Sequence, residues 1–247
     1  SRRIGREVVV YRSTSSTNDT AFNYAPGQGH DGLAIFAEKQ TAGRGRLGSS
    51  WQGGETQSLL FSVLLKDCQL QANLLSLASA VAVAESLENC GCKSVRIKWP
   101  NDVLAGDRKI AGILVESRQS RDHSSSDIVV GIGLNCHQNI QSFDPDIKDK
   151  ATSVDMETGV RCQRNMLARR LLIKLDHWIE TAELDSDKVI EAWKSRSVQL
   201  GRRISVVYNG RLFSGNCIGV DPQEGLIMHL DNGGVRLFDA WHCRIAR

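Results

Sequence analysis

A glycine-rich segment in the first quarter of the chain limits the possible folds most strongly. Gly43–Trp51 reads GRGRLGSSW, and its first six residues match G-x-G-x-x-G, the pattern of dinucleotide-binding loops. In those proteins the loop opens a helix, and the chain then returns as a parallel strand. Here only nine residues, Ser49–Gln57, separate the loop from the next apolar strand, Ser58–Leu65. A parallel return needs about a dozen residues or more, so the sequence excludes a Rossmann fold.

Two other nucleotide-binding loops with a similar pattern are also excluded. The chain has neither the H-R-D nor the D-F-G motif of protein kinases, and it lacks the Gly-Lys pair of a Walker A loop. Glycines let successive backbone N–H groups face an anion, and Arg44 and Arg46 add permanently charged donors. The loop is therefore predicted to bind a carboxylate or phosphate and to be mobile when empty. The alternative is a solvated surface loop.

The order of the expected elements favours an α+β fold, because strands mostly follow strands and helices come in runs. Strands are expected at Val8–Tyr11, Gly32–Gln40, Ser58–Leu65, Val95–Trp99, Asp102–Ala105, Lys109–Ser117 and Asp127–Cys136. Helices are expected from about Asn18, over Gln71–Cys90, and near Met166–Thr181 and Asp185–Ser197, with a polar loop at Ser117–Asp127. After Leu200, five short strands predict a small β-barrel. We expect one unit over residues 1–198 and a second over 199–247.

Charge and cysteine usage narrow the classes of partner. The net charge of +3 is too small to indicate nucleic-acid binding, and no apolar run is long enough to span a membrane. The seven cysteines are scattered and form no C-x-x-C pair, which argues against a zinc site or thioredoxin-like motif. They favour reduced thiols in a cytoplasmic protein.

Two further segments offer candidate binding residues at the ends or edges of strands. Asn101 and Asp102 follow Pro100, which ends a strand, so they project as ligand-binding residues often do or form a plain turn. Lys109 enters an apolar strand that Gly112 interrupts. This lysine either neutralises charge on an anionic reactant or lies on an exposed strand edge.

The segment GIGLN places Gly131 and Gly133 inside a buried strand, where glycine is unfavourable unless something approaches closely. A flat ligand lying on the sheet would explain both glycines, as would tight packing of a helix. Taken together, the motifs predict a floor of glycines, an anion-binding loop, one lysine and an Asn-Asp pair.

In this combination the chain resembles the biotin protein ligases. The motifs GRGRLGSSW, KWPNDV, KIAGILVE and GIGLNC occur in the order typical of that family. Ser16–Asn18, Ala37–Arg46, Ala151–Gly159 and the strand-rich C-terminal segment also fit. The resemblance covers nearly the whole chain. It implies a class II synthetase-like catalytic domain, with a mixed and largely antiparallel sheet packed with helices, followed by a small SH3-like β-barrel.

The resemblance implies a two-step ligase reaction. Biotin and ATP, with Mg²⁺, form biotinyl-5′-AMP and pyrophosphate, and a lysine of a biotin carboxyl carrier protein of acetyl-CoA carboxylase then displaces AMP. A carboxylate is already ionised at neutral pH, so the first step needs charge neutralisation and alignment rather than a base. The resemblance is to the short form without an N-terminal DNA-binding domain, which implies no nucleic-acid partner and is compatible with a homodimer.

The resemblance also assigns the site residues. The catalytic set is Lys109, Arg44, Arg46 and Asp102. The biotin-binding set is Ser16, Thr17, Asn18, Gln40, Gly43, Arg44, Gly45, Arg46, Lys109, Gly112, Gly131 and Gly133. The set for ATP and the adenylate is Arg46, Trp51, Asn101, Asp102, Lys109 and Asn135, with Mg²⁺ near Asp102.

One departure from the family pattern concerns the pyrophosphate side of the loop. Many bacterial members carry a third basic residue shortly before the tryptophan, whereas this chain has Ser49 and Ser50 there. Two alternative functions are a lipoate or octanoate ligase and a non-catalytic binder of biotin or nucleotide. The GRGR and KWPND segments favour biotin, and Lys109 together with the two loop arginines favours catalysis.

Overall fold

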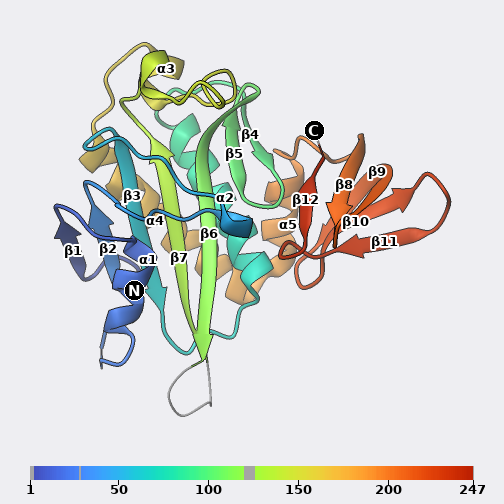
Figure 1. The fold of residues 1–247 in the computed structure, drawn as a ribbon. Helices are drawn as coiled ribbons and strands as arrows, with labels where there is room; N and C mark the ends of the chain where they lie inside the picture. Colours follow the sequence, from blue (N-terminus) through green and yellow to red (C-terminus); the bar gives the residue numbers. More distant parts are fainter. Residues whose placement is uncertain (1–2, 28, 120–125, 247) are drawn as a thin grey trace.

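A seven-stranded sheet forms the centre of the molecule (Figure 1). The computed structural model describes residues 3–27, 29–119 and 126–246. Across the sheet the strands are β1 (Val8–Tyr11), β2 (Ala34–Ala37), β3 (Ser58–Leu65), β7 (Ser126–Asn135), β6 (Arg108–Gln119), β5 (Asp102–Ala105) and β4 (Val95–Lys98). The first pair, β1 and β2, is parallel, and all other neighbours are antiparallel. The predicted mixed and largely antiparallel sheet is confirmed.

Helices pack against both faces of this sheet, but unequally (Figure 1). The helices α2 (Ala72–Glu88), α4 (Arg164–Leu184) and α5 (Ser186–Lys194) form a layer on one face. The short helix α1 (Thr17–Tyr24) lies against β3 and β7 on the other face. Because α2 is enclosed between the sheet and α4, its residues are apolar or small on most sides.

The two-residue repeat of the strands separates the two faces. In β3, Phe61 and Val63 belong to the main core beneath the helices, while Leu64 packs with Phe22 of α1 and Val129 of β7 on the opposite face. This second apolar cluster is small. It anchors α1 at one end of the face, and the candidate site described below occupies the strands beside it.

The C-terminal residues form a separate antiparallel sheet of five strands (Figure 1). Its strands, in spatial order, are β11 (Val235–Phe238), β10 (Gly225–Leu230), β9 (Arg211–Asp221), β8 (Arg203–Tyr208) and β12 (Cys243–Ile245). All five predicted strands are present. Buried side chains of this sheet, such as Met228 and Phe238, belong to the same apolar cluster as the first sheet. The division at residues 198 and 199 stays a prediction.

Three local predictions differ from the structure. The polar segment Ser117–Asp127 was expected to be a loop, but β6 and β7 continue into it through pairs such as Arg118 with Asp127. Cross-strand pairing there outweighs the polar composition, and residues 120–125 lie outside the described residues. The strand expected at Gly32–Gln40 is shorter, and the small helix α3 (Val154–Thr158) was not predicted. No helix in the described part of the chain is both long and apolar enough to cross a membrane.

The side chain of Gln199 generates a stability prediction. Gln199 Oε1 accepts from the backbone N–H of Trp99 at 2.9 Å, and its Nε2 donates to the Trp99 carbonyl at 2.9 Å. Both residues are buried. Gln199→Leu leaves two buried backbone groups unpaired, so we expect the free energy of unfolding to fall by about 2–4 kcal/mol in urea denaturation. Gln141→Leu, at an exposed side chain, is the control and should change it by less than about 0.5 kcal/mol. Equal urea midpoints for the two variants would contradict this role.

Candidate active site

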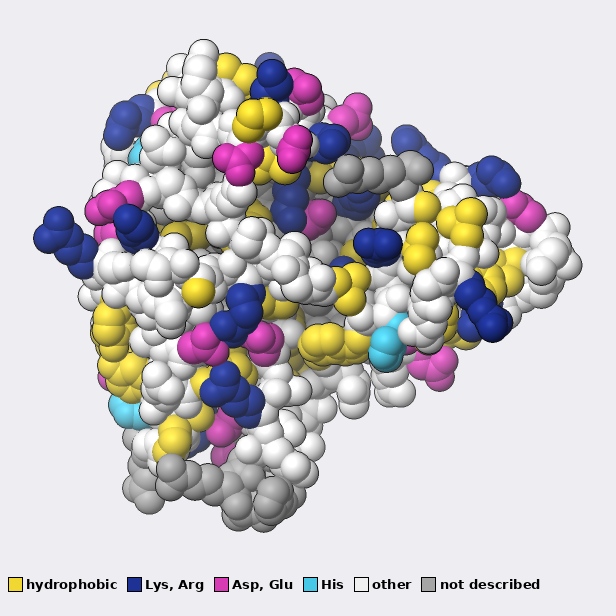
Figure 2. Space-filling view, viewed as in Figure 1, with side chains coloured by type: hydrophobic (Ala, Val, Ile, Leu, Met, Phe, Trp, Pro, Cys, Tyr) yellow, Lys and Arg dark blue, Asp and Glu magenta, His cyan; other side chains and the backbone are white. Residues whose placement is uncertain are grey.

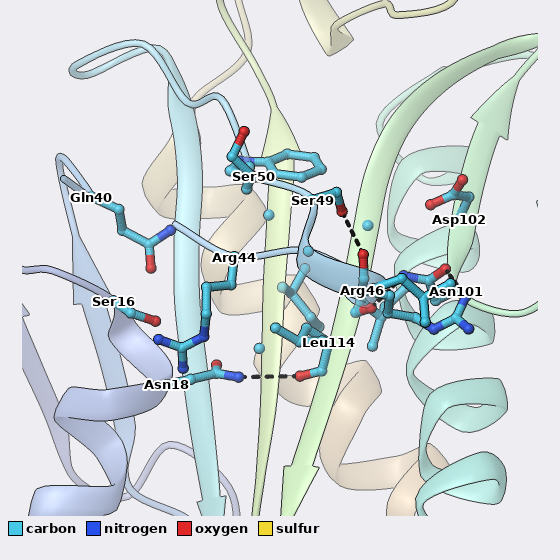
Figure 3. A pocket seen from close by; sticks show the side chains of 18 of the residues that line it. Ser16, Asn18, Gln40, Arg44, Arg46, Ser49, Ser50, Asn101, Asp102 and Leu114 are labelled. Carbon is cyan, nitrogen blue, oxygen red and sulfur yellow. Dashed lines mark hydrogen bonds between the residues drawn. The ribbon is translucent and has the colours of Figure 1, made fainter. Parts of the chain in front are cut away.

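A cavity of about 420 Å³ lies between the start of α1, the glycine-rich loop, strands β5, β6 and β7, and β12 (Figure 3). The structure brings every predicted site residue to its lining except Gly43 and Asn135. Gly43 packs behind the loop, where an added Cβ would lie 3.0 Å from the Gln40 amide nitrogen. The lining residues that were not assigned a role are Leu47, Ser49, Ser50, Ile113, Leu114, Ile132 and Arg244.

One end of the cavity is polar and is built on the first turn of α1. The backbone N–H and the hydroxyl of Thr17 donate to Gln40 Oε1 at 2.7 and 3.0 Å. Ser62 Oγ of β3 lies 2.7 Å from Thr17 Oγ1 and 2.6 Å from Asn18 Oδ1. These residues are buried or half-buried, so their hydrogen bonds fix the direction of each polar atom. Sequence reasoning missed Ser62, whose only signal is a hydroxyl inside an apolar strand.

Arg44 lies at this polar end, as Figure 3 shows. It pairs with Asp19 at 2.5 Å and with Glu116 at 3.1 Å, and Glu116 also accepts from Asn18 Nδ2 at 2.6 Å. The hydrogen bond from Arg44 lowers the pKa of Asp19, and the same bond raises the pKa of Arg44. Basic and acidic side chains alternate over this part of the surface (Figure 2). The first loop arginine is therefore held by two carboxylates beside the cavity.

Arg46 points the other way and connects the loop to the C-terminal sheet. Its Nη2 donates to the carbonyls of Ala240 and, at 3.1 Å, of Cys243, and its Nη1 lies 3.4 Å from Asn101 Oδ1. Burial lowers the pKa of this guanidinium. Leu47, the apolar side chain of the loop, is 60% exposed, so the two arginines and not Leu47 fix the loop to the rest of the molecule. Mobility of the empty loop stays a prediction.

The glycines of β6 and β7 make room for side chains of this chain. An added Cβ at Gly133 would lie 2.4 Å from the Trp51 ring, and one at Gly112 would lie 3.0 Å from it. At Gly131 it would lie 2.1 Å from Asn18 Oδ1. Both explanations offered for Gly131 and Gly133 apply in part, because both glycines line the cavity while Asn18, which closes on Gly131, belongs to helix α1. They form a floor that Trp51 and Asn18 approach closely.

A β-bulge turns Lys109 into the cavity. Val103 pairs with Ala111 and Leu104 pairs with Lys109, so Ile110 has no partner on β5. Without this extra residue, the alternation of β6 would direct Lys109 toward the helices. Instead Ile110 is fully buried in the main core, and Lys109 Nζ lies 2.5 Å from Asp102 Oδ1 and 5.4 Å from the centre of the Trp51 ring.

A second cavity, of about 920 Å³, shares Trp51, Asp102 and Lys109 with the first. It adds Asn135, whose Nδ2 donates to the Thr152 carbonyl at 3.0 Å. Ser49 and Ser50 line both cavities as well, and the other residues of the second are Gly48, Gln52, Lys98, Leu104, Asp107, Phe143, Ile147, Lys150 and Ala151. The arrangement can hold two ligands whose reacting ends meet at one lysine.

Two polar features of the cavity walls lack a partner within the described residues. Trp51 Nε1 is buried and makes no hydrogen bond there. Arg244, on β12, lines the first cavity together with Ser49 and Ser50 and is exposed. It was not predicted, because nothing in its local sequence distinguishes it from a surface residue of a strand. The C-terminal sheet thus brings the positive charge of Arg244 to the same cavity as Ser49 and Ser50, the loop positions that carry no basic side chain.

Comparison with known proteins gives consistent matches. Residues 10–135 match the model of the biotin/lipoate A/B protein ligase family. The chain is 36% identical to the biotin–[acetyl-CoA-carboxylase] ligase of Mycobacterium tuberculosis, over 93% of this chain and 85% of that protein. It is 29% identical to the bifunctional ligase/repressor BirA of Bacillus subtilis, over 96% and 74%. The structure of a biotin protein ligase from Aquifex aeolicus in complex with biotin and ATP has a TM-score of 0.82 and 25% identity, covering 98% of this chain and 99% of that chain.

The pair of Asp19 and Arg44 generates a pH prediction. In the folded state the hydrogen bond from Arg44 lowers the pKa of Asp19 below its ordinary 3.8. The ionised Asp19 therefore stabilises the folded protein fully above about pH 4, and this stabilisation is lost as the pH falls. Because both side chains are about one-third exposed, its size should be below about 1 kcal/mol. In urea denaturation between pH 6 and pH 3, Asp19→Asn should reduce the slope of stability against pH. Asp149→Asn, at an exposed position, should leave the slope unchanged, and parallel profiles for all three proteins would refute the pair's contribution.

Proposed function

The chain belongs to the biotin/lipoate A/B protein ligase family, and on this premise we propose that it is a biotin–[acetyl-CoA-carboxylase] ligase. It activates biotin with ATP as biotinyl-5′-AMP and transfers the biotinyl group to a lysine of a biotin carboxyl carrier protein. The observation that carries this proposal is the pair of cavities that meet at Lys109, Asp102 and Trp51. Relatives that bear this activity in their names, and a neighbouring structure that holds biotin and ATP, support it.

The first step joins two anions, so it depends on nearby positive charge. The biotin carboxylate is ionised at neutral pH and attacks the α-phosphate of ATP, and pyrophosphate leaves. Lys109 stands where the cavities meet and neutralises charge on the carboxylate and the α-phosphate. Asp102 forms an ion pair with Lys109 Nζ and fixes its position. The residues supply alignment and charge, and no general base is required.

The polar end of the first cavity suits the ring of biotin. Hydroxyl and amide groups of Ser16, Thr17, Asn18 and Gln40 can pair with the polar atoms of the ring, since they include both donors and acceptors. The backbone of the glycines and the wall of Leu114 provide the apolar remainder of the cavity. The loop residues Arg44, Gly45 and Arg46 cover it from the side of the carboxylate, and Gly43 supports the loop from behind.

The second cavity suits the nucleotide. We assign Trp51 and Asn135, which line this cavity, to the nucleotide subsite. Asn101 and Arg244 reach the nucleotide from the first cavity, and we assign Arg244 to the phosphates that the missing loop cation would contact. ATP enters as its Mg²⁺ complex. Asp102 is the carboxylate that both cavities share, and Mg²⁺ is commonly held by one or two carboxylates together with phosphate oxygens. The Asp102 carboxylate, together with oxygens of the triphosphate, therefore suits Mg²⁺.

In the second step the amine of the carrier lysine attacks the carbonyl carbon of the mixed anhydride, and AMP leaves with the electron pair of the broken bond. The acyl-adenylate is sensitive to water, so a covering loop protects it until the carrier arrives. We assign residues 1–198 to catalysis and residues 199–247 to a C-terminal unit that contributes Arg244. All seven cysteines are free, which supports a cytoplasmic location. A homodimer and the absence of a nucleic-acid partner stay predictions.

The function is tested by mass spectrometry of a carrier domain incubated with this protein, biotin and MgATP. We expect the carrier to gain one biotinyl group, and Lys109→Ala to lower the rate by about 10²–10³-fold because the charge at the reacting atoms is lost. Lys188→Ala, at an exposed residue of α5, is the matched control and should retain full activity. Tight binding of lipoate with weak binding of biotin, or biotin binding without release of AMP and pyrophosphate, would exclude the proposal.

Gly131 tests the biotin subsite. Gly131→Ala places a methyl group against Asn18 Oδ1, so Asn18 must move away from the polar end. We expect the KM for biotin to rise about tenfold or more, which corresponds to the loss of roughly one hydrogen bond to the ligand. Gly219→Ala is the matched control, because its Cβ would approach only Ile227 at 3.8 Å. A biotin KM equal to that of the control would remove this end of the cavity from biotin binding.

A further inference from the structure

Three side chains with metal-ligating atoms gather just beyond the end of β7, away from the lining of both cavities. Ligand atoms of His137, Asp155 and Cys162 all lie within 4.8 Å of one another. The neighbouring thiol of Cys136 is outside this cluster and donates to the Leu134 carbonyl at 3.7 Å. The three residues come from the segment after β7, from α3 and from the segment between α3 and α4.

The spacing of these atoms is close to that of a tetrahedral metal site. With bonds of about 2.0–2.1 Å to nitrogen or oxygen and 2.3 Å to sulfur, the ligands around zinc lie roughly 3.3–3.8 Å apart. His137 Nδ1 lies 2.8 Å from Asp155 Oδ2, and the three-residue cluster spans at most 4.8 Å. A shift of about 1 Å in side chains alone therefore brings the ligands to bonding distance.

Backbone contacts hold the three segments together without a metal. The Cys162 N–H donates to Asp155 Oδ1 at 2.7 Å, and the Asp155 N–H donates to the Cys136 carbonyl at 3.0 Å. The His137 N–H donates to the Gln57 carbonyl at 2.8 Å. One oxygen of Asp155 is thus held by the backbone while the other faces the histidine. This is the arrangement in which a neighbouring hydrogen bond orients a metal-binding carboxylate.

Charge and access also suit a divalent cation. One thiolate and one carboxylate balance the charge of a divalent ion, and the imidazole is a neutral ligand. The side chains of His137 and Asp155 are 10% and 22% exposed, so an ion can enter from solvent.

We propose that His137, Asp155 and Cys162 form a zinc site that ties the segment after β7 to α3 and to the segment before α4, with a water molecule as the fourth ligand. One sulfur, one imidazole nitrogen and one carboxylate oxygen select zinc over magnesium or calcium, which prefer oxygen alone. The sequence argued against zinc because it contains no C-x-x-C pair. The fold instead joins ligands from three separate segments.

Cobalt(II) reports the geometry directly, because it replaces zinc and a tetrahedral thiolate site gives strong visible and near-ultraviolet absorption. We expect the reduced full-length protein to bind one equivalent of cobalt with both bands, and zinc to displace it. Zinc at about 100-fold above its Kd should raise Tm by about 5–10 °C. Cys162→Ser should abolish the sulfur-to-cobalt band and the zinc-dependent shift, whereas Cys90→Ser, also half-buried, should retain both.

Measurements on the wild type with and without the chelator EDTA keep the test valid if Cys162→Ser fails to fold. Cobalt absorption without a thiolate band, or a Tm that zinc leaves unchanged in the wild type, would overturn the site. Cobalt spectra that are identical in Cys162→Ser and Cys90→Ser would overturn it as well. Biotin transfer is not used as a readout, so the outcome is separate from that of the proposed ligase reaction.

Discussion

The alternation of side chains along β6 and β7 governs the rest of the structure, because these strands serve two purposes at once. On one face, Ile132 and Leu134 pack beneath the helices in the main core. On the other, the intervening Gly131 and Gly133 leave the backbone bare for Asn18 and Trp51. A shift in register by one residue would place glycines in the core and branched apolar side chains in the cavity. The extended pairing of β3, β7 and β6 fixes this register over the whole length of the strands.

The bulge at Ile110 is the one break in this alternation, and the chemistry depends on it. It returns an apolar side chain to the core and directs the Lys109 ammonium toward Asp102. Both effects come from a single extra residue, so neither stability nor function is sacrificed for the other. The loop arginines add a second constraint, since Arg44 is bound to the first sheet and Arg46 to the C-terminal one. Arg44 now pairs with Asp19 and Glu116. If a ligand carboxylate replaced one of these partners, Arg44 would keep the same number of ion pairs.

Periodicity and turn residues were enough to predict much of the fold. The strands Ser58–Leu65 and Asp102–Ala105 match the structure to the residue, because their apolar runs end at clear polar or turn signals. The residues that the resemblance assigned to the site line one cavity, apart from Gly43 and Asn135. Sequence reasoning failed where tertiary pairing decides the outcome. The bulge that orients Lys109 and the position of Arg244 on β12 depend on partners that are remote in the chain.

The zinc-binding cluster and the second cavity are linked through Asn135. This residue ends β7, and its amide donates to the Thr152 carbonyl, whose own residue lies just before α3. His137 lies two residues after Asn135, and Asp155 lies in the first turn of α3. A metal that joins His137 to Asp155 would therefore restrain both sides of the Asn135–Thr152 contact. Because a wall of the nucleotide subsite rests on this contact, metal occupancy would affect the order of that wall without any contact to the ligand.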